Sequence, residues 1–218
     1  MFNNKMKPKI LVAIISNQKH WPSYFCLNVM ELMFYTINQG IKADLRTFSS
    51  VEVNMMRNFV CKFAESEKYT HIMMLDTDMK YQKDCIIKLL KHDKDFVVGT
   101  AKQRVPPFLP TQYKKFKTEN FKDDSNRVNF TKDSTELTKI GSSGVVGALI
   151  KTKVLKTLNY PYFKVDYKKS KLSVTGGDVY FCKQLFENKI DLWCDPTIDY
   201  AHEVNAMVNR SGVFIQNG

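Results

Sequence analysis

Two aspartates separated by one residue, Asp76 and Asp78, stand at the end of the unbroken apolar run of residues 72–75. Such a short apolar run is typical of a strand buried on both faces in a mostly parallel sheet, and open α/β sheets bind ligands at the carboxyl edge of such strands. Residues two apart in extended backbone point the same way. We therefore expect both carboxylates to face one divalent cation, Mg²⁺ or Mn²⁺, shared with substrate phosphates. A solvated turn carrying two acids is the alternative.

A second candidate group is Asp178, which follows two glycines at the start of an amphipathic helix. The spacing predicts that the inner face of this helix carries Val179, Phe181, Cys182, Leu185 and Phe186. An aspartate at this position can be the N-cap of the helix. It can also act as a general base, because N-capping leaves the carboxylate ionised near a cleft. The sequence leaves both interpretations open.

Three further polar or small residues lie at predicted strand ends. Ser16 ends the predicted strand 9–16, at the same edge of the sheet as the aspartates. Gly144 belongs to the small-residue turn 141–147, where glycine permits either close backbone approach to a ligand or tight packing. His202 follows the last predicted strand. On its own, it is as consistent with an ordinary hydrogen-bonded histidine as with a metal ligand.

The first hundred residues alternate between strand and helix patterns, which predicts an α/β half-sheet. Strands are expected over 9–16, 41–47, 72–75 and 95–100, and helices over 22–40, from about 52 to 63, and around 85–90. The spacing predicts inner faces made of Phe25, Val29, Leu32, Met33 and Ile37 in the first helix, and of Met56, Phe59, Val60 and Phe63 in the second. The absence of G-x-G-x-x-G and P-loop motifs argues against a dinucleotide dehydrogenase or a Walker ATPase.

The second half of the chain is less regular. Residues 101–135 interleave Lys and Arg with aromatics and prolines, which predicts a long loop with short antiparallel strands over the sheet edge. This loop is either a lid or acceptor-binding segment, or a solvated basic excursion. Residues 137–150 return to the core, a short helix is expected over 151–158, and two further strands over 190–194 and 198–203.

Composition limits the class of protein. With 218 residues, of which 44% are hydrophobic, the chain can form one sizeable core. Its net charge of +11 suggests an anionic partner without choosing among nucleotide, nucleic acid, acidic glycan and membrane surface. Five scattered cysteines without C-x-x-C argue against a disulfide framework or zinc site and favour the cytoplasm. The apolar run 10–15 is too short for a signal peptide core or a membrane span.

Taken in order, these motifs resemble the GT-A glycosyltransferases, especially the small single-domain enzymes of viruses, phages and bacteria. The matching segments cover residues 10–203 of the chain. They are the D-x-D motif within 75–78, Arg57-Asn58, Lys102, the glycine-rich segment 144–150, Gly177-Asp178, Asp195-Pro196 and His202. One position departs from the family, since its acidic pair is Gly177-Asp178 here and the first acid is missing. The resemblance implies that the missing acid is one that would hydrogen-bond to the acceptor.

The resemblance implies a single α/β GT-A domain over 1–218, with a Rossmann-like, mostly parallel sheet. About 1–100 would be the nucleotide-sugar-binding half, and about 101–205 the acceptor and catalytic half with a smaller antiparallel portion. It implies sugar transfer from a nucleotide-sugar donor, such as a UDP-sugar, to a glycan or another hydroxyl acceptor. Implied roles are metal binding (Mn²⁺ or Mg²⁺) for Asp76, Asp78 and His202, donor binding for Ser16, Arg57, Asp76, Thr77, Lys102 and Gly144, and catalysis by Asp178 as the base of an inverting reaction. A retaining reaction on the same fold would use Asp178 differently.

Three other functions compete with this interpretation. A nucleotidyltransferase shares the sheet and the carboxylates, but it opens with a Gly-rich loop after its first strand, and residues 15–19 contain no glycine. A basic nucleic-acid-binding module would explain the charge and the aromatics between Lys102 and Lys132, but not the buried core. A phage-type enzyme that glycosylates modified bases in DNA would combine a donor site with a basic face.

Overall fold

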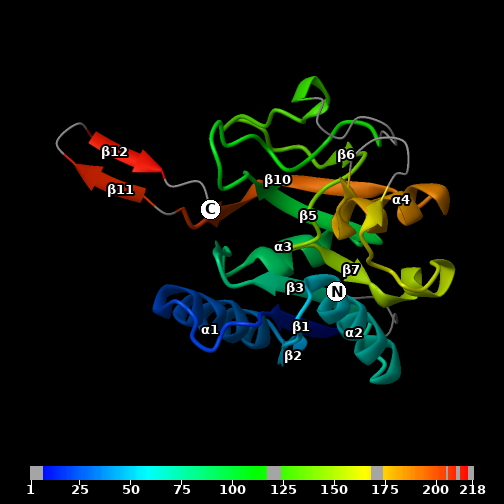
Figure 1. Cartoon of the computed structure of the whole chain (residues 1–218). Helices are drawn as coiled ribbons and strands as arrows, with labels where there is room; N and C mark the ends of the chain where they lie inside the picture. Colours follow the sequence, from blue (N-terminus) through cyan, green and yellow to red (C-terminus); the bar gives the residue numbers. More distant parts are fainter. Residues whose placement is uncertain (1–6, 117–123, 168–173, 205, 210–211, 216–218) are drawn as a thin grey trace.

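The computed structural model describes residues 7–116, 124–167, 174–204, 206–209 and 212–215. Lys117, Phe121 and Lys122 of the basic, aromatic segment lie outside the described residues. The core of the fold is an eight-stranded sheet in the order β2-β1-β3-β7-β5-β10-β4, with β6 paired to β10 (Figure 1). Its strands are β1 (Lys9–Ile15), β2 (Lys42–Phe48), β3 (His71–Asp76), β4 (Met79–Lys80), β5 (Phe96–Ala101), β6 (Thr138–Ile140), β7 (Leu149–Lys151) and β10 (Leu192–His202).

The sheet is mostly parallel, as the sequence predicts. β1 pairs in parallel with β2 and β3, and β5 pairs in parallel with β10. β7 lies between β3 and β5 and is antiparallel to both. Residues 72–75 at its centre are 0% exposed, which confirms that this apolar run is a strand buried on both faces. The α/β fold class is therefore confirmed.

The predicted division of the last core segment into two strands is wrong. Residues 192–202 form the single strand β10, which pairs with β5 on both sides of an irregularity between Asp195 and Asp199. At this irregularity the Asp195 carboxylate accepts hydrogen bonds from the Thr197 amide (2.9 Å) and hydroxyl (2.7 Å). Because the side chain satisfies the local backbone, the strand bends at Asp195-Pro196 without leaving the sheet.

Helices cover both faces of the sheet. They are α1 (Ser23–Asn38), α2 (Val53–Ser66), α3 (Cys85–Lys91) and α4 (Gly177–Glu187), with the short 3₁₀ helices η1 (Asp124–Asn126) and η2 (Thr152–Thr157). α1 packs beside α3, and α2 packs beside η2. The Glu52 carboxylate caps α2 by accepting a 2.8 Å hydrogen bond from the Met55 amide, while Gly40 follows α1 with a φ of +76°.

Each predicted helix face contains one error. Ile37, Phe59 and Phe186 are 50%, 59% and 58% exposed, although their spacing placed them on the inner faces. Polar residues occupy inner positions instead, and they are Thr36, Asn58 and Gln184. A pattern that counts apolar residues alone therefore misplaces one residue on each of these helix faces and misses the buried polar ones.

The buried amides are tolerated because they bind backbone groups of a distant segment. Asn58 donates to the Phe163 carbonyl (2.8 Å) and accepts from the Phe163 amide (3.1 Å). Gln184 donates to the Tyr162 carbonyl (3.2 Å) and accepts from the Asn159 amide (2.7 Å). Fully paired amides carry little penalty for burial, and here they fix residues 159–163 against both helices.

Two small antiparallel pairs lie outside the main sheet. β8 (Asp166–Tyr167) pairs with β9 (Val174–Thr175), and β11 (Ala206–Asn209) pairs with β12 (Gly212–Ile215) in a hairpin that extends from the body in Figure 1. The short strands predicted within 101–135 are isolated bridges in the described part of that segment, such as Lys102 with Pro110. None of the described helices is both long and apolar enough to cross a membrane.

Candidate active site

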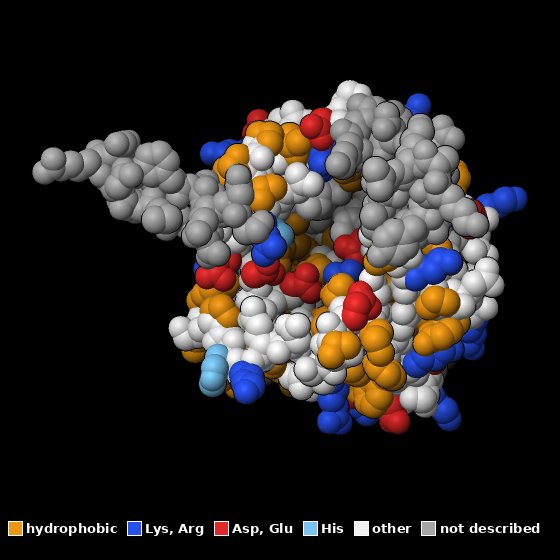
Figure 2. Space-filling view, viewed as in Figure 1, with side chains coloured by type: hydrophobic (Ala, Val, Ile, Leu, Met, Phe, Trp, Pro, Cys, Tyr) orange, Lys and Arg blue, Asp and Glu red, His pale blue; other side chains and the backbone are white. Residues whose placement is uncertain are grey.

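A cleft of about 640 Å³ opens at the carboxyl edge of the sheet. The ends of β1 and β3 line it together with the start of α2 and two later segments, 104–105 and 203–204. Figure 2 shows a hollow at the centre of this face, with acidic and basic side chains on its walls. The volume lies within the range of small-molecule pockets, roughly 300–1,000 Å³.

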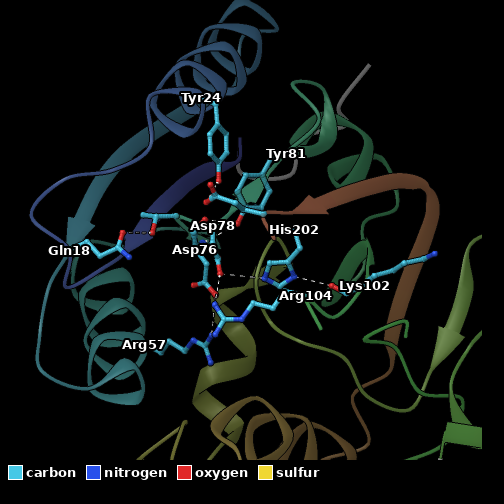
Figure 3. Close-up of polar contacts among 11 residues, drawn as sticks. Gln18, Tyr24, Arg57, Asp76, Asp78, Tyr81, Lys102, Arg104 and His202 are labelled. Atoms are coloured by element: carbon cyan, nitrogen blue, oxygen red, sulfur yellow. Dashed lines mark hydrogen bonds and ion pairs between the residues drawn. The ribbon is translucent and has the colours of Figure 1, made fainter. Parts of the chain in front are cut away.

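The two aspartates line the same cleft but have different partners. β3 ends at Asp76, Thr77 and Asp78 form a turn, and β4 begins at Met79, so the extended backbone expected over this motif is wrong. The Asp76 carboxylate lies 3.9 Å from Arg57 Nη2. The Asp78 carboxylate faces His202 (Figure 3). The turn thus presents one acid to α2 and the other to the end of β10.

Tyr81 stabilises the turn through the backbone of Asp76. The Asp76 amide donates to the Tyr81 hydroxyl oxygen at 3.0 Å, and Tyr81 is almost fully buried. Asn28 of α1 in turn holds the backbone of Tyr81, with its amide group donating to the carbonyl (2.7 Å) and accepting from the N–H (2.6 Å). The backbone at Asp76 is therefore fixed by α1 through two buried contacts.

Arg57 joins the Asp76–Asp78 turn to the start of α4. It lies on α2, is 7% exposed, and forms an ion pair with Asp178 in addition to its contact with Asp76. Gly176 is the N-cap of α4, and no side-chain hydrogen bond caps this helix. The N-cap interpretation of Asp178 is therefore wrong, because its carboxylate is directed to Arg57.

Burial raises the pKa of Asp76 to about 6, and the nearby carboxylates of Asp178 and Asp78 act in the same direction. The Arg57 guanidinium opposes this rise. Since like charges near one another are unfavourable, a further cation in the cleft would favour the ionised form of Asp76. The site is thus electrostatically suited to a positive ligand at the turn.

His202 has a defined tautomer. Its Nδ1 lies 2.9 Å from the Lys102 carbonyl oxygen, which can only accept, so Nδ1 carries a proton. Its Nε2 lies 3.5 Å from Asp78 Oδ2. This interaction raises the pKa of His202 and lowers the pKa of Asp78. In the neutral imidazole, Nε2 and the carboxylate are both acceptors, so a proton or a metal ion between them would make their contact favourable.

This pair fits a cation that is shared with a ligand. Among the described residues, no three His, Cys, Asp or Glu side chains gather into a ready-made metal site. Asp78 and His202 supply one carboxylate and one imidazole, and the Lys102 carbonyl oxygen orients the imidazole by accepting a hydrogen bond from Nδ1. Mg²⁺ commonly binds to one or two carboxylates and completes its coordination with substrate phosphates and water.

The positively charged side chain beside Asp78 is that of Arg104, which no sequence motif marked. Arg104 Nη1 lies 3.5 Å from Asp78 Oδ2 and lines the cleft. Lys102, proposed for this role, contributes its carbonyl oxygen, while its side chain extends away from Asp78 in Figure 3. Both residues belong to the basic segment, and the direction of each side chain distinguishes them.

Ser16 and Thr77 line the cleft and both contact Gln18. The Ser16 hydroxyl oxygen accepts a hydrogen bond from the backbone N–H of Gln18 at 3.1 Å. The Thr77 hydroxyl donates to the side-chain oxygen Oε1 of Gln18 at 3.3 Å. At the rim, Tyr24 donates to the Glu203 carboxylate at 2.9 Å, and the Glu203 amide donates to the Asp78 carbonyl at 2.8 Å. Gln18, Tyr24 and Glu203 had no motif that marked them in the sequence.

The structural reason for glycine differs among the positions of the turn 141–147. A Cβ on Gly141 would lie 2.2 Å from the Lys115 backbone carbon, and Gly147 has a φ of +73° with Tyr200 against it. Tight packing therefore explains these two. At Gly144 a Cβ would lie 3.7 Å from Asp178 Oδ2, an ordinary contact distance. Packing does not require glycine there, and its backbone lies beside the candidate base.

The missing first acid of the pair has a structural counterpart. A Cβ on Gly177 would lie 1.8 Å from Asn54 Oδ1, so a side chain at position 177 would require Asn54 to move. Asn54 is 7% exposed and donates to the Glu52 carboxylate at 2.6 Å. The side-chain amide of Asn54 thus occupies the space beside Asp178 that an acidic side chain would need.

No family model and no curated protein matches the sequence. Solved structures match the fold, and one of them is A197 from STIV, with 15% identity, a TM-score of 0.56, and coverage of 96% of this chain and 95% of that chain. GalNAc-T7 with UDP, GalNAc and Mn²⁺ matches with 11% identity and a TM-score of 0.56, over 92% of this chain and 44% of that one. S. aureus TarS 1–349 matches with 15% identity and a TM-score of 0.50, over 89% and 60%. The predicted GT-A fold is confirmed.

Proposed function

We propose that the protein is a metal-dependent glycosyltransferase that moves a sugar from a nucleotide-sugar donor to an acceptor hydroxyl with inversion. The observation that carries this proposal is the Arg57 bridge, whose guanidinium pairs with both Asp178 and Asp76 and so sets the Asp178 carboxylate near the Asp76–Asp78 turn that lines the cleft. The fold shared with GalNAc-T7, whose structure contains UDP, GalNAc and Mn²⁺, supports it.

The donor would bind along the carboxyl edge of the sheet. Ser16, Thr77 and Asp76 would face the nucleotide, and Arg57 and Arg104 would bring positive charge to the diphosphate. When bound, Mn²⁺ or Mg²⁺ would neutralise the charge that develops on the departing nucleoside diphosphate. Asp78 and His202 would hold the ion directly, and Asp76 through water or the ribose.

Asp178 would act as the general base. As the acceptor oxygen attacks the anomeric carbon and the bond from that carbon to the diphosphate oxygen breaks, Asp178 would take the hydroxyl proton. The ion pair with Arg57 fixes the direction of the carboxylate. A base in this position typically contributes ~10²–10⁴-fold to the rate. Gly144 would allow the substrate to approach this carboxylate closely.

The acceptor would be a glycan or another hydroxyl compound, bound mainly by residues of the 101–205 half. We place the reaction in the cytoplasm, since Cys61, Cys85, Cys182 and Cys194 are buried free thiols and Cys26 is an exposed one. A modified base in DNA is the alternative acceptor. One positively charged residue of the segment 101–135 already pairs within the protein. Arg127 donates to Asp124 at 2.8 Å and lies over the Tyr113 ring.

The experiment is a screen of nucleotide sugars for release of free nucleotide, with Mn²⁺ or with EDTA. Slow transfer of the sugar to water makes an acceptor unnecessary. We expect release from one class of donor with Mn²⁺ and none with EDTA. Release that EDTA does not change would contradict metal dependence, and no release from any donor would contradict the proposed function. Salt-sensitive retention of duplex DNA, measured in parallel, would favour the DNA acceptor, and no retention at low salt would exclude it.

A further inference from the structure

Helix α1 is apolar on its outer face as well as on its inner face. Leu27, Met30, Phe34 and Ile37 are 63%, 51%, 62% and 50% exposed, while Phe25 and Leu32 on the other side are fully buried. Figure 1 shows α1 at the outer edge of the molecule. A helix that is apolar all round is normally buried on every side, and clustered exposed apolar side chains mark interaction surfaces. We call these four exposed residues the α1 stripe.

The spacing of the α1 stripe is that of a helix–helix seam. Its members are three, four and three residues apart, the a/d pattern by which two helices pack at a small crossing angle. The described helix is 16 residues long, so the stripe runs along most of its length. The surface therefore fits another helix better than it fits a strand or a loop.

The α1 stripe is also complementary to itself. Leu27 and Ile37 lie five residues on either side of Leu32, and Met30 and Phe34 lie two residues on either side. In an antiparallel pair of α1 helices related by a two-fold axis near Leu32, Leu27 would face Ile37 of the second copy, and Met30 would face Phe34. Every apolar side chain then meets an apolar side chain, as an isologous interface requires.

The charge distribution favours the same occupant. The chain carries a net charge of +11, yet α1 has no Lys or Arg, and Glu31 is its one charged residue. Two copies can therefore approach along α1 without opposing cations. A membrane-surface helix would need Lys or Arg on its polar face, and α1 offers none. Pairing through the edge strand β2 is disfavoured by its exposed Lys42 and Arg46.

We propose that the protein forms a homodimer through antiparallel packing of α1 against α1 of a second copy. This proposal is independent of the proposed enzymatic activity. It assigns the α1 stripe to the interface and leaves the cleft of each copy open. The other possible occupants, a lipid surface or a different protein, are outcomes of the test.

The first test measures the mass of the full chain by sedimentation over a wide range of micromolar concentrations. We expect twice the chain mass of 25.3 kDa for the wild type. Phe34→Glu is expected to weaken dimerisation by roughly 30-fold or more, the effect of a hot-spot residue. Phe59→Glu is the matched control, because Phe59 is 59% exposed on α2 and should leave the dimer unchanged. Circular dichroism checks that both variants fold.

The second test maps the register. In the proposed pair, Leu27 of one copy faces Ile37 of the second, five residues on either side of Leu32. A chain with both Leu27→Cys and Ile37→Cys should therefore form intermolecular disulfides under mild oxidation, whereas a chain with Leu27→Cys alone should not. A wild type that stays monomeric at all concentrations, whether or not it binds lipid vesicles, would overturn the proposal. A folded Phe34→Glu variant that dimerises as well as the wild type would also overturn it.

Discussion

Arg57 and Asp178 lie 121 residues apart in the sequence and form an ion pair with each other. The same guanidinium lies 3.9 Å from Asp76 and is almost buried, beside the ring of Phe163. One side chain of α2 therefore sets the distance between the candidate base and the candidate metal turn. The predictions that follow test this arrangement and the fold around it.

Arg57→Met should lower kcat/KM by at least ~10²-fold, because it removes a charge-assisted contact to both carboxylates. It should also lower the free energy of unfolding by about 1–3 kcal/mol, since the partly buried acids lose their partner. Donor turnover and urea denaturation measure the two effects. Arg46→Met, on exposed Arg46 of β2, is the control. Wild-type turnover in Arg57→Met would remove Arg57 from the site.

Asp178→Asn should lower kcat by ~10²–10⁴-fold, because the asparagine side chain cannot take the proton from the acceptor hydroxyl. The affinity for the donor should stay nearly unchanged. Single-turnover kinetics with saturating donor separate these quantities. Asp191→Asn is a matched control, since Asp191 pairs with Lys139 at 2.7 Å outside the cleft. An unchanged kcat would limit Asp178 to a structural contact with Arg57.

Gly141→Ala should lower the stability of the fold, whereas Gly144→Ala should change substrate binding. At Gly141 the new Cβ meets the Lys115 backbone at 2.2 Å, so we expect a loss of about 1–3 kcal/mol in stability. At Gly144 the nearest atom is 3.7 Å away, so the fold should keep its stability while substrate KM rises. Thermal unfolding and initial rates test both. Normal kinetics for Gly144→Ala would show that nothing approaches this backbone.

Stability should depend on pH through His71. Burial, with the charge of Lys151, lowers the pKa of His71 to about 4, so the folded protein keeps this side chain neutral. The unfolded chain binds the proton near pH 6.5. Its contribution to stability is therefore complete above about pH 6.5 and is lost as the pH falls towards 4, on the order of 3 kcal/mol.

The difference in unfolding free energy between the wild type and His71→Asn isolates this dependence from that of the carboxylates. It should change between about pH 6.5 and 4 and be constant above that range. His20→Asn, at an exposed histidine, is the control and should show no such slope. A difference curve that is flat from pH 7 to 4 would contradict the pKa assigned to His71.

The buried strands could be predicted because their residues are apolar without interruption. β1 and residues 72–75 of β3 need no partner information to be recognised. The inner faces of the helices could be predicted only in part, because Thr36, Asn58 and Gln184 are buried through hydrogen bonds. For the two amides, the partners come from residues 159–163, far away in sequence.

Part of the candidate site was visible as motifs, and part was not. The acids Asp76, Asp78 and Asp178 carry recognisable patterns, and the structure brings them into one neighbourhood with His202. Arg104 was one basic residue among many, and only the fold directs it towards Asp78. Tyr81 acts through backbone contacts with Asp76, which no spacing pattern encodes.

The measurement that tests the central claim most directly is Mn²⁺ binding, followed by electron paramagnetic resonance, in the presence of UDP. The wild type should bind Mn²⁺ in a UDP-dependent way, and Asp78→Asn and His202→Gln should each weaken this binding by at least ~10-fold. Asp84→Asn, which alters a carboxylate paired with Lys88 at 2.9 Å, should bind as the wild type does. Equal Mn²⁺ binding by the wild type, Asp78→Asn and His202→Gln would contradict a metal site at this turn.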